Sequence, residues 1–563
     1  MQIFSKKPNN TQVKNTRQLP IVGNLLIAFG LITGAFVFGK SLYQQGAHTL
    51  VKYVLQGRVE ELPDGAIKEA LIEASGLITS ETYAYQQNDL STLYLDIPFE
   101  NTQVIQQKRD EAVETGVLLA SDEDYVSATV RYDDSAPMDV KLRLKGDWTD
   151  HLEGQKWSYR IHIQDDSAIE GMRRFSIQAP ETRAFVYEWA YHQTLMKEGL
   201  LAPRYFFINV IENGEYKGIY AMEESFYTEL MESQQRRSGV ILRYDEDDMW
   251  QNWAAFFSVG KEDLRTSAGS SGYFMESDFL AANISGFGKT KILSDQVLED
   301  EYRIAQEMLR GYQSGGLNAS DVFDMEQMGK FFAITELWGA GHSLAWHNLR
   351  FYYNPVTNLL EPIGFDGLPM TEPFVAVNFN AINTEDFLFN DPEIRKAIYL
   401  FIHDYLEDGY LESLRDELFQ EAGDYTDALN KNYFIDTTIN WEKLNVQRDH
   451  LREQLDPINY LTIYLDASAE EADVTNLNIA NTYMVPLEIS GIEIRHDDRV
   501  IQKFHLDSEL PCMLPGESQF TTIGLPLSLN LDSIALDEQM IYIELFEPQK
   551  MNKTFWISVS DIN

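Results

Sequence analysis

Cysteine and basic side chains are both scarce in this chain. Its 563 residues include a single cysteine, Cys512, which excludes an intrachain disulfide. Lysine and arginine number 45 against 88 aspartates and glutamates, which gives a formal net charge of −43 at pH 7. Nucleic-acid phosphates need a basic footprint, so this balance argues against nucleic acid as a partner. The excess of acid favours solubility, and acidic loops can also collect divalent cations.

The chain also lacks an internal repeat, whereas apolar and aromatic residues are plentiful. Hydrophobic residues make up 44% of the sequence and aromatic residues 12%. This content argues against disorder, and the length is sufficient for two or three domains with cores of their own.

Residues 18–39 form a run without a charged side chain, QLPIVGNLLIAFGLITGAFVFG. About 20 apolar residues, each rising about 1.5 Å, span a bilayer core, so we expect a transmembrane anchor here. A cleavable signal peptide is the alternative, but Phe36 and Phe38 occupy positions where cleavage requires small residues. Residues 1–17 contain basic residues and no acid, so the positive-inside rule predicts a cytoplasmic tail and a body outside the cytoplasm.

The body begins with a polar segment, residues 40–91, which we interpret as a helical stalk. Alternating strands follow, with Val126 to Tyr132, Met138 to Lys145 and Trp157 to Ile163 the clearest. Residues 182–198 then have a helical pattern whose apolar face includes Trp189, which we expect to be buried.

Asn213-Gly214 lies between two apolar runs and predicts a β-hairpin. A second hairpin is expected from Arg350 to Tyr353 and Leu359 to Phe365, followed by helices over 390–455. Short alternating runs separated by turn residues from 460 to 563 predict a small β-sandwich.

Two of the predicted strands concentrate the scarce positive charge. Five basic residues fall within 20 positions: Lys141, Arg143, Lys145, Lys156 and Arg160. Basic groups on one face of a sheet are often simply solvated, but a convergent set also suits an anion such as phosphate. Glu223 or Glu224, at the end of a hairpin strand, could pair with one of them.

The second hairpin places polar residues at its open end. His347 and Asn348 precede the first strand, and Asp366 follows the second. Because the strands should pair antiparallel, Asn348 should lie near Asp366, where an amide and a carboxylate oxygen could hold Mg²⁺ or Mn²⁺. A simple Asp-Gly turn is the alternative. If a metal is bound, we expect Asp366→Asn to abolish metal-dependent nucleotide binding and to leave the fold intact.

The order of these parts resembles the family of spore coat protein H-like kinases over about residues 95–455. The likeness is carried by KLRLKGDWTDHLEGQKWSYRIHI, RAFVYEWAYHQTLMKEGLLAPRYFFINVIENGEYKGIYAMEE and HNLRFYYNPVTNLLEPIGFDG. It implies an α+β, two-lobed, atypical kinase-like domain over 92–455, using ATP with Mg²⁺ or Mn²⁺. It also implies a single-pass protein of a bacterial plasma (inner) membrane, with a protein substrate or an envelope partner.

The resemblance assigns roles to individual residues. Lys156 or its neighbours Lys145 and Arg160 would bind the phosphates, with Glu224 as the partner of the lysine. Asn348 and Asp366 would hold the metal.

The chain departs from the family at one position, because no aspartate lies between Glu336 and Asn348, where the family has its catalytic aspartate. His342 and His347 are there instead, and a histidine can act as a base near neutral pH. The alternative is a catalytically inactive relative that serves as an envelope or surface binding protein.

Overall fold

The computed structural model describes residues 88–455 except 153, 155, 259–275, 371–387, 389–390 and 434–435. After residue 455 it describes only the segments that form strands. The predicted cytoplasmic tail, the predicted anchor at 18–39 and nearly all of the predicted stalk therefore lie outside the described residues. Among the helices that are described, none is long and apolar enough to cross a membrane.

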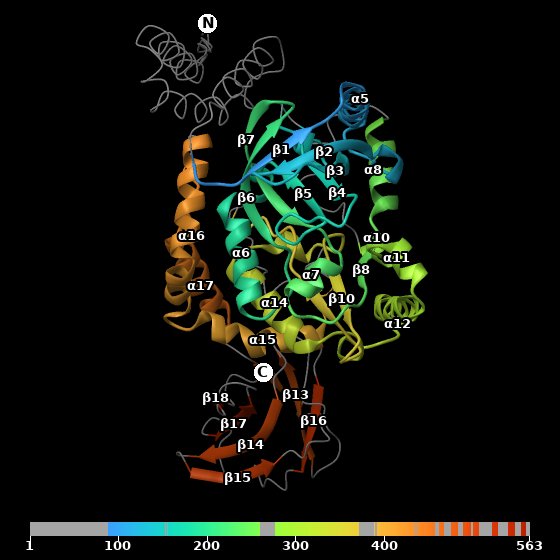
Figure 1. Ribbon diagram of the computed structural model, residues 1–563. Coiled ribbons are helices and arrows are strands. Elements are labelled where there is room, and N and C mark those ends of the chain that lie inside the picture. The colour runs from blue at the N-terminus through green and yellow to red at the C-terminus, as the bar shows by residue number, and fades with distance from the viewer. Residues whose placement is uncertain are drawn as a thin grey trace, which may run out of the picture.

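Seven strands close into a barrel in the order β1-β2-β3-β4-β5-β7-β6 (Figure 1). They are β1 (Thr92–Asp96), β2 (Val126–Tyr132), β3 (Met138–Leu144), β4 (Tyr159–Ile163), β5 (Arg174–Gln178), β6 (Tyr205–Glu212) and β7 (Glu215–Glu224). Neighbouring strands pair antiparallel except β1 and β6, whose parallel pairing closes the barrel. The predicted Asn213-Gly214 turn joins β6 to β7 and is confirmed.

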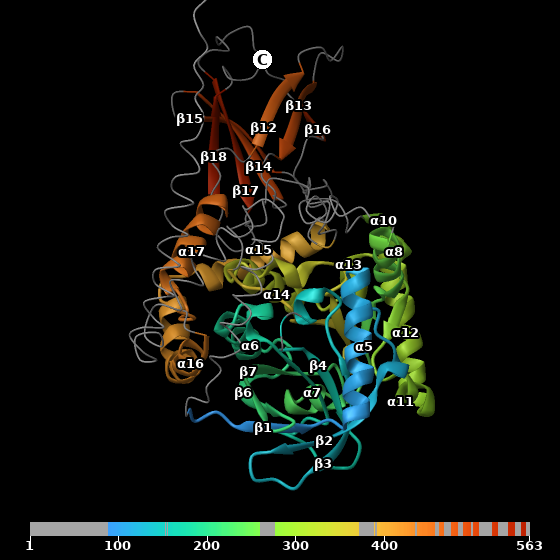
Figure 2. The ribbon, with the colours of Figure 1, turned by 90° about the horizontal axis from the view of Figure 1, so that it is seen from above.

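Alternation of side chains along the strands fills the barrel. Val140, Leu142 and Leu144 of β3 are buried among the apolar residues of its interior. Because successive side chains point to opposite faces, the basic residues of β3 and β4 lie on the outer face. Helix α5 (Phe99–Thr115) lies alongside the barrel (Figure 2).

A second sheet, in the order β11-β10-β8-β9, packs beside the barrel. It contains β8 (Ile241–Tyr244), β9 (Ile284–Gly286), β10 (Arg350–Asn354) and β11 (Leu359–Ile363). The hairpin of β10 and β11 confirms the prediction for this segment. Helices surround the sheet: α7 (Thr228–Ser233), α8 (Asp247–Ser258), α10 (Glu276–Ala281), α11 (Lys289–Ser294), α12 (Gln296–Gln313) and α13 (Ala319–Val322).

Helix α6 (Val186–Lys197) connects the barrel to the helical part of the molecule. Trp189 is fully buried there, as predicted, with its ring 5.4 Å from that of Tyr425. Around it pack the larger helices α14 (Met325–Leu337), α15 (Pro392–Leu406), α16 (Tyr410–Tyr433) and α17 (Trp441–Leu455). Asp391 caps α15 by accepting from the backbone N–H groups of Glu393 and Ile394.

Two antiparallel sheets make up the C-terminal part, which both views place away from the barrel (Figures 1 and 2). One contains β12 (Leu461–Asp466), β13 (Val474–Asn481) and β16 (Thr521–Pro526). The other contains β14 (Glu488–His496), β15 (Arg499–His505), β17 (Gln539–Phe546) and β18 (Lys553–Ser558). Within the described residues, none of these strands pairs with the barrel or with the second sheet.

The predicted fold class is wrong, although a mixed α+β composition agrees with the structure. The first seven strands close into a barrel rather than forming the small lobe of a two-lobed kinase-like domain. The transmembrane helix that was part of this prediction has no counterpart in the described residues. Strand alternation is the same in an open and a closed sheet, so the sequence pattern did not distinguish them.

Candidate functional site: two ion pairs between the barrel and the second sheet

Lys145, which directly follows β3, is the basic residue that reaches the junction between the barrel and the second sheet. Its side chain is buried and donates to Glu223 on β7 and to Gln178 on β5, at 2.5 Å in each case. Burial lowers the pKa of Lys145, and the Glu223 carboxylate opposes that shift. The pair therefore places a positive group in the interior with one carboxylate beside it.

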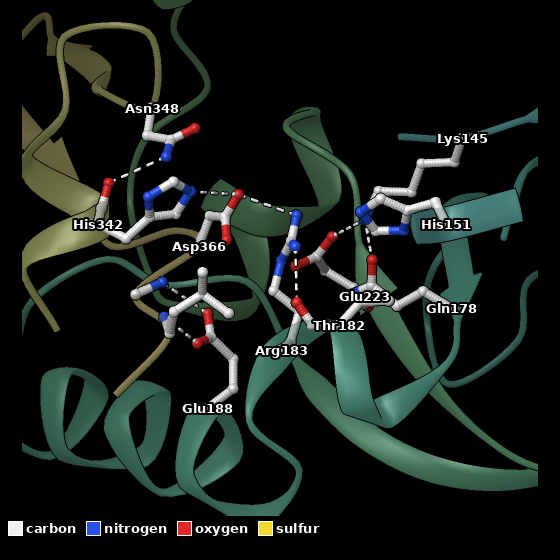
Figure 3. A network of polar contacts seen from close by, with 12 residues as sticks. Lys145, His151, Gln178, Thr182, Arg183, Glu188, Glu223, His342, Asn348 and Asp366 are labelled. Atoms are coloured by element: carbon white, nitrogen blue, oxygen red, sulfur yellow. Dashed lines mark hydrogen bonds and ion pairs between the residues drawn. The ribbon is translucent and has the colours of Figure 1, made fainter. Parts of the chain in front are cut away.

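A second ion pair, Arg183–Asp366, lies next to the first (Figure 3). Arg183 ends the short 3-10 helix Pro180–Arg183, and its Nη2 is 2.9 Å from Oδ2 of Asp366. On the other side of Asp366, Nε2 of His342 is 3.6 Å from the same oxygen. Burial alone would raise the pKa of Asp366, but Arg183 and then His342 hold it below its ordinary value.

Asn348 is tied to the same group, because its Nδ2 donates to the carbonyl of His342 at 2.9 Å. The pairing of Arg350 with Ile363 puts the open end of the β10–β11 hairpin at this point. The hairpin geometry therefore brings Asn348, His342 and Asp366 together, as Figure 3 shows.

The loop after β11 is held in place by a buried carboxylate. Asp366 has a φ of +54°, a left-handed conformation that aspartate and asparagine tolerate better than most residues. The N–H groups of Gly367 and Leu368 both donate to Glu188 of α6 at 3.0 Å. A side chain at Gly367 would meet the ring of Tyr191 at 2.8 Å, so only glycine fits there.

Glu188 is in turn paired with His192, one turn further along α6. The two side chains are fully buried, with Nε2 of His192 3.2 Å from Oε1 of Glu188. Nδ1 of His192 lies 2.9 Å from the carbonyl of Pro203. Burial lowers the pKa of His192, but the hydrogen bond and charge of Glu188 outweigh it, and the net shift is upward. His192 therefore supports the Asp366 loop through Glu188.

The two ion pairs form one electrostatic unit. Lys145 contributes to the low pKa of Asp366, and Arg183 contributes to the low pKa of Lys145. Each carboxylate also has one buried oxygen, Oε1 of Glu223 and Oδ1 of Asp366, that accepts no hydrogen bond from a described residue. The unit thus holds two positive groups and two unused acceptor oxygens at one place.

Several predicted site residues lie elsewhere. Lys156 is buried between the rings of Tyr220 and Tyr433, 4.9 and 4.5 Å from their centroids. Glu224 points to the other side of β7 from Glu223 and accepts from Arg204 at 3.0 Å. The assignment of Lys156 and Glu224 to a shared phosphate site is therefore not supported by their contacts.

The two candidate bases differ in their surroundings. His347 is buried, and burial, reinforced by the nearby His342, lowers its pKa to about 3. It would stay neutral near pH 7 and would hold a proton poorly. The side chain of His342 is 40% exposed and faces Asp366, so His342 is the one of the two that an external ligand can reach.

Sequence reasoning missed Arg183, Glu188 and Gln178. Arg183 lies in the 3-10 helix before α6, within residues 182–198 that were predicted as one helix, and no spacing rule pointed to it. Glu188 had a detectable signal, since it is a charged residue in a helix whose neighbours Trp189 and Ala190 are fully buried. A charge in such a place needs a partner, and this one supports the site.

The donor set offers a divalent metal only part of a ligand shell. No group of three or more His, Cys, Asp or Glu side chains within the described residues is placed to hold a metal ion. Asp366 Oδ1 is buried and accepts no hydrogen bond from a described residue, whereas the amide of Asn348 turns its nitrogen to the carbonyl of His342 and its oxygen away from Asp366 (Figure 3). Mg²⁺ commonly uses one or two protein carboxylates and takes its other ligands from water and phosphate, so Asp366 fits such an ion, and Asn348 would join it after a turn of its amide.

Comparisons with known proteins add no family. No protein-family model matches the chain, and no curated protein matches it significantly. The resemblance to the spore coat protein H-like kinases therefore rests on the sequence segments quoted above.

Proposed function

We propose that this junction binds a nucleoside triphosphate with a divalent cation and transfers its terminal phosphoryl group to a hydroxyl acceptor, as in the spore coat protein H-like kinases that the sequence resembles. The observation that carries the proposal is the pairing of Lys145–Glu223 with Arg183–Asp366 at one buried place. Phosphoryl transfer depends mainly on positioning and on neutralising charge, and the unit provides groups for both.

Lys145 and Arg183 are the residues that would contact phosphate oxygens. Both are buried; Lys145 is shared between Glu223 and Gln178, whereas Arg183 is paired with Asp366. Glu223 keeps Lys145 charged despite burial and aims its ammonium group. An arginine guanidinium can bind a phosphate by two parallel hydrogen bonds, which suits Arg183 to orienting the transferred group.

Asp366 and Asn348 would hold the divalent ion, which would supply neutralisation of phosphate charge when bound. The chain's own contribution is to keep Asp366 ionised and fixed. Arg183 and His342 hold its pKa low, and Glu188 immobilises the backbone that follows it.

His342 is the candidate base. In the transfer, the acceptor oxygen forms the new bond to phosphorus, the bond to the leaving nucleoside diphosphate breaks, and the acceptor proton passes to the imidazole. The 40% exposure of His342 lets an acceptor approach it, and its Nε2 faces Asp366 at 3.6 Å.

A non-catalytic binding protein is the second candidate, and one observation favours it. Arg183 already occupies Oδ2 of Asp366 at 2.9 Å. A metal ion can take Oδ1, but if Arg183 never yields the other oxygen, the unit is a structural lock between the barrel and the second sheet.

A thermal-shift titration of the whole chain with ATP and Mg²⁺ or Mn²⁺ tests the proposal. A ligand at 100 times its Kd should stabilise the protein by about 2.7 kcal/mol. Lys145→Met should abolish that shift. Asp366→Asn should remove the dependence of the shift on the metal, measured against its own melting temperature without ligand because the variant leaves the Arg183 charge unpaired. Asp408→Asn, at a carboxylate whose side chain is 87% exposed, is the matched control.

A transfer assay with γ-labelled ATP separates the two candidate functions. We expect His342→Gln to keep nucleotide binding and to lose transfer. Nucleotide binding without any transfer by the unmodified protein would favour the non-catalytic reading. An unmodified protein that shows no metal-dependent shift with ATP would overturn the nucleotide site itself.

A further inference from the structure

Arg143 on β3 and Arg160 on β4 face each other on the outer side of the barrel, in direct register. Like charges placed opposite each other on neighbouring strands repel, so such a pair normally has carboxylates beside it. Neither guanidinium is in an ion pair with a described residue. Arg143 donates to the carbonyl of Leu144 and lies over the ring of Tyr125, 5.4 Å from its centroid, and Arg160 makes no hydrogen bond within the described part of the chain.

Burial makes this arrangement costly. The Nε atoms of both arginines are inaccessible to solvent and have no acceptor. Burial lowers the pKa of Arg160, and the charge of Arg143 lowers it further. At His162, the next outward residue of β4, burial together with Arg174, Arg160 and Arg143 lowers the pKa to about 3. The outer face of β4 thus gathers several arginines around His162, in a chain whose formal charge is −43.

Two neighbouring arginines differ from this pair because each has a carboxylate within ion-pair distance. Arg243, at the end of β8, is 2.8 Å from Glu246, and Arg350 of β10 is 3.5 Å from the same carboxylate. The Asp147 carboxylate attracts both Arg160 and Arg143 electrostatically, but it forms no ion pair with either of them. Carboxylates thus form ion pairs with the arginines of the second sheet, whereas no described carboxylate lies within ion-pair distance of Arg143 or Arg160.

The position of the pair is well defined. Trp148, which follows β3, packs edge-on against Trp250 and Trp253 of α8, with ring centroids 5.1 and 5.5 Å apart. This contact fixes α8 and the end of β8 against the rim of the barrel, so the arginine pair has a rigid frame. A rigid frame lowers the cost of binding because few side chains need to be ordered.

We propose that Arg143 and Arg160 form a binding site for a phosphate-type oxyanion, distinct from the Lys145–Asp366 site. Two guanidiniums offer parallel hydrogen bonds to one tetrahedral anion, and the anion would relieve their mutual repulsion. The oxyanion is either free phosphate or a phosphomonoester group on a second ligand. This inference stands on the arginine pair alone and does not depend on nucleotide binding.

Calorimetric titration of the whole chain with inorganic phosphate tests the site, with phosphoserine as the monoester probe. Arg160→Met should weaken phosphate binding by about tenfold or more, since a hydrogen bond to a charged group is lost. Arg415→Met, at an exposed arginine on α16 paired only with its neighbour Asp416, should bind as the unmodified protein does. Equal affinity for phosphoserine and phosphate would assign the site to a group on a larger ligand, and binding of phosphate alone would assign it to the free ion.

The melting temperature of Arg160→Met and the phosphate affinity of Lys145→Met test the site further. Without phosphate, Arg160→Met should melt at or above the temperature of the unmodified protein because repulsion is relieved, so loss of binding is not loss of fold. Lys145→Met should retain phosphate binding. Unchanged phosphate affinity in Arg160→Met would overturn the site, and so would one-for-one displacement of phosphate by ATP, which would make these arginines part of the nucleotide site.

Discussion

Glu223 is the residue on which the charge balance of the junction depends. Lys145 is buried, and Glu223 is its charged partner, so Glu223→Gln would leave a buried cation without a counter-ion. Removing one partner of a buried pair typically costs about 3–5 kcal/mol. We expect a loss of that order at pH 7 in urea unfolding.

The same variant makes a prediction about pH. The folded pKa of Lys145 is below the value in the unfolded chain, so unfolding free energy rises with pH once Lys145 begins to lose its proton. The cost of Glu223→Gln should therefore shrink between pH 7 and pH 10. Glu417→Gln, in the exposed pair with Lys197, serves as the control and should cost no more than about 1 kcal/mol. A cost for Glu223→Gln that matches this control would contradict the buried-pair interpretation.

Arg183 and Asp366 should be energetically coupled. Asp366→Asn was expected from the sequence to leave the fold intact, but the structure gives Asp366 a buried arginine as partner. Each single variant, Arg183→Gln and Asp366→Asn, should therefore destabilise the protein, and the double variant should cost less than their sum. Interaction energies of contacting pairs are about 0.5–3 kcal/mol. Additive costs in a urea double-mutant cycle would show that the pair is not a unit.

For individual residues of the candidate site, the sequence predicted which residues lie there better than it predicted which residue each of them contacts. Lys145, Asn348 and Asp366, which the sequence singled out, lie at one place in the structure, and their roles there stay a prediction. The glutamate was not, because Glu223 and Glu224 point to opposite faces of β7 and a shift of one position exchanges them. Arg183 belongs to a 3-10 helix that ends before α6, where the sequence predicted one helix from residue 182, so the direction of its side chain was not predicted.

Helix α6 is the element that joins the site to the core. Trp189 is fully buried on it, next to Glu188, which holds the Asp366 loop. Replacing a core tryptophan with alanine typically costs about 3–5 kcal/mol. We expect Trp189→Ala to lower the melting temperature markedly and to weaken ligand binding at the junction. An unchanged melting temperature would contradict the packing of this helix.

The Glu188–His192 pair on α6 should make stability depend on pH. The folded pKa of His192 is raised above the unfolded value, so its contribution is fully present below about pH 6.5 and is lost as pH rises through the folded pKa. The difference in unfolding free energy between the unmodified protein and His192→Gln should therefore decrease as the pH is raised from 6 upward. A difference that stays constant from pH 5 to pH 9 would contradict a charged His192.

Elements with local patterns were predicted well, and those that depend on distant contacts were not. Alternation in β3 and the Asn213-Gly214 turn are properties of a few neighbouring residues. Closure of the barrel depends on the parallel pairing of β1 with β6, which are more than 100 residues apart, as the register of Thr92 with Asn209 shows. A parallel pairing of this kind has no local sequence signal, so the barrel was missed.

At the scale of the whole molecule, a formal charge of −43 should make stability depend on salt. Self-repulsion destabilises a compact, highly charged chain, and salt screens it over a Debye length of about 10 Å at 0.1 M. We expect the unfolding free energy to rise between 10 mM and 500 mM salt. Choline chloride should act like sodium chloride if screening is the cause. A response to sodium alone would instead indicate specific cation binding.

The C-terminal sheets should be separable from the rest of the molecule. Their strands pair only among themselves in the described residues, whereas α17 belongs to the main core through Leu444, Leu451 and Leu455. Gln447 of this helix also donates to the carbonyl of Glu336 in α14 at 2.8 Å.

A chain that ends at Leu455 should therefore keep the melting temperature and the ligand affinity of the full protein. A chain that ends at Asn440 loses α17, which packs against α14. Helix α14 is followed in the chain by the segment that contains His342 and Asn348. We expect this shorter chain to expose apolar surface and to lose binding. If the chain ending at Leu455 also fails to fold or to bind, the C-terminal sheets contribute to the core, and the separation inferred from strand pairing is wrong.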